Sequence, residues 1–94
     1  TLLLVAVVVI GAPIVEELFY RGLLQRSLAD RFNEGAVLVF VAAVFAAVPF
    51  RPVEFPGLFV FGLMLGWAAL RARRLGPAIT IHVGFNLTGL LLVL

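Results

Sequence analysis

Long apolar runs, separated by short polar or proline-rich breaks, dominate this sequence. Four runs predict four helices, at about Leu2–Leu28, Ala36–Val48, Gly57–Arg73 and Pro77–Leu94. The breaks are expected near residues 30–35, 49–56 and 74–77, where Gly, Pro, Asn and charged residues gather. The second run is shorter than the roughly 20 residues that a membrane span needs, unless Phe50 continues it or protein partly buries it. The pattern predicts an all-α, polytopic membrane helical bundle with about four transmembrane helices.

Single residues near the breaks refine these predictions. Asn33 suits the N-cap of the second helix, with Glu34 in its first turn. Pro56 suits the first position of the third helix. Gly62 and Gly66 form a GxxxG pattern, which allows another helix to approach closely.

The composition supports the membrane interpretation. Hydrophobic residues make up 64% of the chain and charged residues 13%, whereas soluble domains are about half apolar and a quarter charged. The net charge of +2 is too small and scattered for a nucleic-acid partner. The absence of Cys excludes disulfides and thiolate metal sites. Because the chain starts with Thr and has few loops, we interpret residues 1–94 as a single core domain of a longer membrane protein.

The arginines predict how the chain is oriented in a cell membrane. If the helices alternate in direction, the loops near Asp30 and Arg74 lie on one side. That side carries five arginines, and the other side carries only Arg51. The five are Arg26, Arg31, Arg71, Arg73 and Arg74. The positive-inside rule then predicts cytoplasmic Arg-rich loops in a multi-pass protein of the lipid bilayer.

Three charged residues interrupt the first apolar run: Glu16, Glu17 and Arg21. Placing each of these charged side chains at the bilayer centre costs on the order of a few kcal/mol or more. Glu17 and Arg21 are one helical turn apart and can pair, whereas Glu16 points about 100° away. The pair either fixes packing only or belongs to a functional site, and ionisable residues inside a membrane favour function.

A second polar pair, His82 and Asn86, lies four residues apart in the last apolar run. A lone histidine is most often a hydrogen-bonded core residue, but its depth is informative. His82 follows Arg74 by eight residues and Glu17 precedes Arg26 by nine, so both lie roughly 12–14 Å from the Arg-rich side. We therefore expect the four polar residues at one level, with a glutamate carboxylate within about 8 Å of the His82 ring, a span that one water can bridge.

Such a cluster has the groups needed to hydrolyse an amide. A glutamate can act as general base on a water, while a histidine and an asparagine donate hydrogen bonds to the developing oxyanion. A divalent metal such as zinc is a further possibility, since one His and two Glu just reach the usual three protein ligands. His82 and Glu16 are then the expected metal ligands, and a metal-free glutamate mechanism is equally open.

At these residues the sequence resembles a known family. Glu16-Glu17-x-x-x-Arg21, the continuation Phe19-Tyr20-Arg21-Gly22, and His82-x-x-x-Asn86 resemble the CPBP family, the CAAX prenyl proteases and bacteriocin-processing enzymes, also called Abi. The resemblance implies an intramembrane endopeptidase that acts on a peptide or protein substrate in the membrane. It implies that Glu16 activates water and that Glu17 and Arg21 support it. His82 and Asn86 would bind the oxyanion, or His82 would be a metal ligand.

The second motif of that family, Phe-x-x-x-His, is only half present. Phe45 is followed four residues later by Pro49, which can neither bind a metal nor orient water. Either Glu54 or the loop around Arg51 substitutes, or this member has lost proteolysis. A member without activity would bind a peptide or a membrane partner, as in bacteriocin immunity. A transporter that uses the Glu–Arg pair as a gate is a third alternative, but no repeated half is visible.

Overall fold

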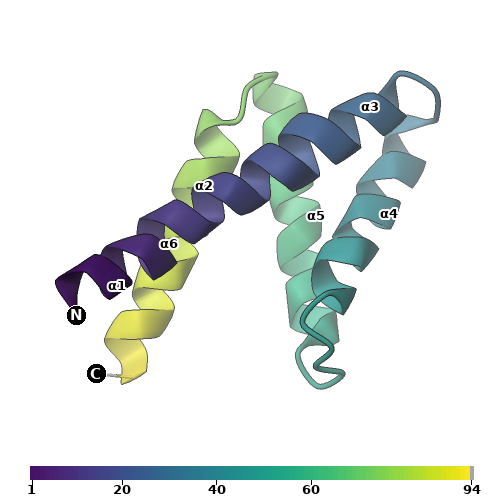
Figure 1. Cartoon of the computed structure of the whole chain (residues 1–94). Coiled ribbons are helices and arrows are strands. Elements are labelled where there is room, and N and C mark those ends of the chain that lie inside the picture. The colour runs from purple at the N-terminus through teal and green to yellow at the C-terminus, as the bar shows by residue number, and fades with distance from the viewer. Residues whose placement is uncertain (94) are drawn as a thin grey trace.

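The computed structural model describes residues 1–93, and Leu94, the predicted end of the last helix, lies outside the described residues. Every regular element among residues 1–93 is a helix, as predicted (Figure 1). The first long helix lies obliquely across the others. Its N-terminal half contacts the last helix, and its C-terminal half contacts the two middle helices.

The first long helix, residues 2–29, alternates between α-helical and π-helical turns. It consists of α1 (Leu2–Ala6), η1 (Val7–Gly11), α2 (Ala12–Glu17), η2 (Leu18–Gln25) and α3 (Arg26–Ala29). In η1 the Ala12 N–H bonds to the Val7 carbonyl, five residues back. This wider turn directly precedes Pro13, which has no N–H to donate. The helix therefore continues through Pro13 to the charged residues.

The other helices are α4 (Glu34–Ala47), α5 (Phe55–Ala72) and α6 (Gly76–Val93). Their bounds lie within two residues of the predicted ones. The Asn33 Oδ1 caps α4 as predicted, accepting hydrogen bonds from the N–H groups of Gly35 and Ala36 at 2.8 and 3.3 Å. The prediction for Pro56 was wrong by one position, because α5 begins at Phe55.

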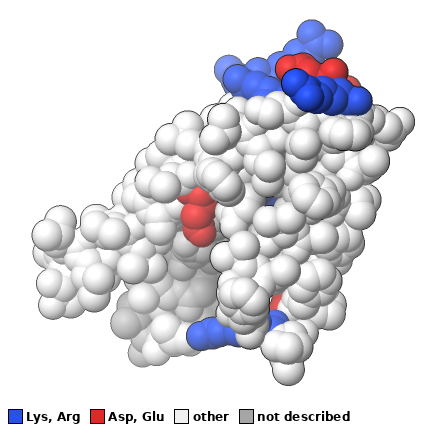
Figure 2. Space-filling view, turned by 45° about the vertical axis from the view of Figure 1, so that its right-hand side comes forward, with Lys and Arg blue, Asp and Glu red and all other residues white. Residues whose placement is uncertain are grey.

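Three helices within residues 1–93 are long and apolar enough to cross a membrane: residues 2–29, α5 and α6. The fourth, α4, has 14 residues and rises only about 21 Å, less than the roughly 30 Å of a hydrocarbon core. Charged side chains gather at the two ends of the molecule, with a mostly uncharged band between them (Figure 2). The arrangement is that of a membrane bundle with three full spans and one shorter helix.

The core lies where α4 packs along α5. Val41, Phe45, Phe61 and Leu65 are buried there. The GxxxG pattern allows the close approach that the sequence predicts, since a Cβ on Gly62 would lie 3.2 Å from the Ala42 Cα. This packing places the middle of α5 directly beneath the charged residues of the first helix.

Candidate active site

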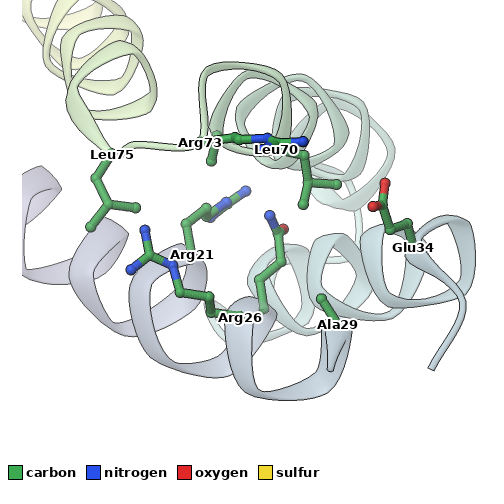
Figure 3. A pocket seen from close by; sticks show the side chains of 9 residues that line it. Arg21, Arg26, Ala29, Glu34, Leu70, Arg73 and Leu75 are labelled. Atoms are coloured by element: carbon green, nitrogen blue, oxygen red, sulfur yellow. The ribbon is translucent and has the colours of Figure 1, made fainter. Parts of the chain in front are cut away.

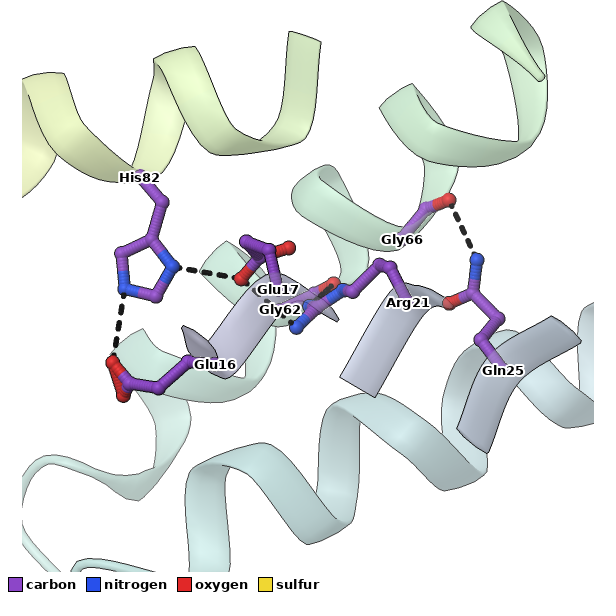
Figure 4. Close-up of polar contacts among 7 residues, drawn as sticks. All are labelled: Glu16, Glu17, Arg21, Gln25, Gly62, Gly66 and His82. Atoms are coloured by element: carbon purple, nitrogen blue, oxygen red, sulfur yellow. Dashed lines mark hydrogen bonds and ion pairs between the residues drawn. The ribbon is translucent and has the colours of Figure 1, made fainter. Parts of the chain in front are cut away.

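Both predicted glutamates lie beside the predicted histidine (Figure 4). The His82 Nδ1 is 2.7 Å from the Glu17 Oε2, and the His82 Nε2 is 3.7 Å from the Glu16 Oε1. One ring nitrogen thus approaches each carboxylate. The expected separation of less than about 8 Å is confirmed, and it is reached without a bridging water on the Glu17 side.

Arg21 lies on the other side of Glu17 and is 2% exposed. Its Nη1 is 3.3 Å from the Glu17 Oε2, and its Nη2 donates to the Gly62 carbonyl at 2.8 Å. The guanidinium carbon also lies 4.9 Å from the centre of the Phe45 ring, within cation–π range. Glu17, with none of its side chain exposed, therefore contacts both Arg21 and His82 through one oxygen, Oε2.

Gln25 extends this polar row, and the sequence reasoning missed it. Its Nε2 donates to the Gly66 carbonyl at 3.2 Å, one turn along from the bond between Arg21 and Gly62 (Figure 4). Glycine has no side chain to cover its carbonyl, so a side chain from a neighbouring helix can reach it. The four-residue spacing of Arg21 and Gln25 matches that of the two glycines, and this match was the available signal.

The position of its hydrogen bonds determines what each His82 nitrogen can do. An ionised carboxylate only accepts hydrogen bonds, so opposite an ionised Glu17 the Nδ1 is the donor. In the neutral ring the Nε2 is then an acceptor, and it lies on the side of Glu16. Phe45 and Phe61 hold the imidazole edge-on, with ring centres 5.8 and 5.7 Å away. These contacts fix the orientation of the ring.

A cavity of about 190 Å³ opens beside this ring. Nine residues line it: Glu16, Phe45, Val48, Pro49, Leu58, Phe61, His82, Phe85 and Asn86. Glu16 is 42% exposed, whereas Glu17 is fully buried and does not line the cavity. Of the two adjacent carboxylates, Glu16 is therefore the one that a water and a substrate can reach.

Asn86 lines the cavity as its spacing from His82 suggested, but it has a partner that the sequence did not indicate. Its Nδ2 donates to the Val8 carbonyl at 3.2 Å, in the π-helical turn of the first helix. An amide nitrogen carries two hydrogens, so one remains for another acceptor.

Pro49 lines the same cavity, so the position at which the family pattern has histidine does face the site. The suggested substitutes do not take its place. Arg51 and Glu54 pair with each other at 3.0 Å on the exposed loop, and neither is among the residues that line the cavity.

The donors at the site do not fit a catalytic metal ion. Among residues 1–93, no group of three or more His, Cys, Asp or Glu side chains is placed to hold one. At His82, the contact with Glu17 uses one ring nitrogen and leaves only Glu16 beside the other ring nitrogen. Structural and catalytic zinc sites normally have at least three protein ligands. A metal requirement stays a prediction.

Comparison with known families gives one match. Residues 1–88 match the family model described as type II CAAX prenyl endopeptidase Rce1-like. The chain belongs to the Rce1-like family. Neither the curated proteins nor the solved structures give a match. Membership of the Rce1-like family confirms the resemblance to CAAX-type proteases that the sequence motifs indicated.

The Rce1-like match covers every candidate site residue, from Glu16 to Asn86. It places this chain among intramembrane proteases of the CAAX type, in agreement with the membrane bundle. The individual roles of Glu16, Glu17, Arg21, His82 and Asn86 stay predictions.

Proposed function

We propose that this Rce1-like chain forms the catalytic core of an intramembrane endopeptidase in which Glu16 activates a water molecule. The observation that carries the proposal is the pairing of a half-exposed carboxylate with a buried, anchored histidine in one cavity. A general base must be reachable by its water, and Glu16 is reachable whereas Glu17 is not.

In this proposal the water lies between the Glu16 carboxylate and the His82 Nε2. The 3.7 Å between those atoms is too long for a good hydrogen bond, and a small shift of the exposed Glu16 would admit a water that donates to both. Glu17 holds the imidazole in the tautomer that accepts at Nε2, and the ion pair with Arg21 holds Glu17 in place. His82 is thus a water-holding group here and not an oxyanion donor.

The reaction then needs one proton shuttle. Glu16 takes a proton from the water, the oxygen attacks the peptide carbonyl carbon, and the protonated Glu16 returns the proton to the leaving amine as the C–N bond breaks. The free N–H of Asn86 is the group that stabilises the oxyanion. The substrate class is a peptide at the membrane, in line with the description of the family as type II CAAX prenyl endopeptidases.

A non-catalytic role is the second candidate, and Pro49 is the observation that favours it. The cavity holds one histidine where the family pattern has two, so the water has one fewer polar partner. A chain that has lost proteolysis in this way would still offer the cavity to a peptide or a membrane partner.

The two candidates separate in a cleavage assay with the reconstituted full-length protein and a library of membrane-anchored peptides. The enzyme proposal predicts products with wild type and with the exposed-loop control Glu54→Gln, and product formation slower by about 10²–10⁴ with Glu16→Gln. Products formed equally by all three proteins, or by none of them, would overturn it and leave the binding role.

A further inference from the structure

A second and larger cavity lies at the Arg-rich end, away from Glu16 and His82. Its volume is about 420 Å³. Side chains from η2, α3, the start of α4, the end of α5 and the α5–α6 connection surround it (Figure 3). The helices end here, and charged side chains gather at this end of the molecule, next to a mostly uncharged band (Figure 2).

The charges around this cavity are unbalanced. Arg21, Arg26 and Arg73 line it together with one acidic residue, Glu34. Arg21 is paired with Glu17, but no ion pair within residues 1–93 includes Arg26 or Arg73. Two guanidinium groups are thus available to an anion at the cavity.

Two polar atoms on the buried side of the cavity also lack partners. The Arg21 Nε and the Gln25 Oε1 are buried without a hydrogen bond, and each of the two residues is 2% exposed. Leaving a buried donor and a buried acceptor unpaired is unfavourable. A ligand that both accepts and donates would satisfy them.

The backbone conformation of Arg73 is a further observation at this cavity. Arg73 ends α5 in the left-handed conformation, with φ 57° and ψ 28°. Glycine is the usual residue at such a position, because a Cβ there is unfavourable. Non-glycine residues in this conformation are often found at ligand-binding sites, and the Arg73 side chain borders the cavity (Figure 3).

We propose that this cavity binds the phosphate-bearing headgroup of an anionic membrane lipid that also carries hydroxyl groups, such as phosphatidylglycerol. Arg26 and Arg73 would bind the phosphate, because guanidinium groups match its oxygens in charge and geometry. A headgroup hydroxyl would donate to the Gln25 Oε1. The location at the charged end of a membrane bundle favours a lipid over free phosphate, which has the same anionic chemistry.

The test uses the purified full-length protein in neutral detergent. Its melting temperature is measured alone, with phosphatidylcholine, with phosphatidylglycerol, and with inorganic phosphate. The variants are Arg26→Gln and Arg73→Gly, and the control is Arg31→Gln, which removes one charge from the same end without touching the cavity. Glycine readily adopts the left-handed conformation of residue 73, so the Arg73→Gly variant is expected to fold.

Phosphatidylglycerol is expected to raise the melting temperature of wild type and of Arg31→Gln by several degrees more than phosphatidylcholine does, because a ligand of the folded state stabilises it. This extra shift should be absent in Arg26→Gln and Arg73→Gly. Equal shifts in all four proteins, or none in wild type, would overturn the proposal. So would a full shift with inorganic phosphate alone, which would assign the site to a free anion.

Discussion

Glu16 and Glu17 are neighbours in sequence, yet the fold gives them opposite environments. Glu17 is fully buried between Arg21 and His82, and Glu16 is 42% exposed beside the cavity. The 100° step of the helix alone separates them. A buried, paired carboxylate is suited to holding other groups in place, and an exposed one is suited to exchanging protons with water.

The burial of Arg21 predicts a large loss of stability when it is removed. Arg21→Ala leaves the Glu17 charge with less compensation in the core, at a cost of about 3–5 kcal/mol for comparable buried pairs. Arg31→Ala, on the exposed loop, should change stability by less than about 0.5 kcal/mol. Thermal unfolding of both purified variants checks this, and equal shifts would show that the buried pair contributes nothing to stability.

Asn86 provides a second test at the residue scale. If its free N–H stabilises the oxyanion, Asn86→Ala should lower kcat by about 10²–10³ while KM changes little. Thr88→Ala is the matched control, since Thr88 is in the same helix but bonds to the Gly84 carbonyl outside the cavity. A loss confined to KM would indicate that Asn86 only binds substrate.

At the scale of the helices, the sequence predicts much of what the structure has. Apolar length, the Asn33 cap and the Gly76-Pro77 pair place the helix ends within two residues. The shared depth of Glu17 and His82 follows from counting residues between charges, because helical rise is constant. These features depend on local chemistry, which the sequence carries directly.

Other features depend on which helices meet, and the sequence did not reveal them. The bond from Asn86 to the Val8 carbonyl arises where the first helix crosses α6. The bond from Gln25 to Gly66 joins residues 41 positions apart, so it depends on how the first helix and α5 are aligned along each other. The roles of the site residues are predictions still, since neither the fold nor family membership measures a reaction.

The space around each glycine predicts which one can be replaced. A Cβ on Gly66 would lie 2.5 Å from the Leu38 Cδ1 and 2.7 Å from the Gln25 Oε1, so Gly66→Ala should cost about 1–3 kcal/mol. A Cβ on Gly84 would meet nothing within 4 Å, so Gly84→Ala should be neutral or stabilise by up to about 1 kcal/mol. Comparable melting temperatures in detergent would argue against the tight contact of α5 with its neighbours.

For the whole molecule, the open prediction is its orientation. The loops that carry five of the seven arginines lie at one end, and the positive-inside rule places that end in the cytoplasm. Single cysteines at Phe32 and Val53, both exposed and at opposite ends, can report it. A membrane-impermeant thiol reagent should label Val53→Cys in intact cells and Phe32→Cys only after permeabilisation. The reverse pattern would invert the proposed topology.

The central claim is that Glu16 and His82 act together on one water, and a double-mutant cycle tests it most directly. His82→Asn keeps a donor for Glu17 and removes the ring nitrogen near Glu16. We expect Glu16→Gln to lower kcat/KM by about 10²–10⁴ in the reconstituted full-length protein, and the double variant to be no slower than Glu16→Gln alone, because groups that act as a unit are not additive. A wild-type rate in Glu16→Gln, or fully additive losses in the double variant, would contradict the account.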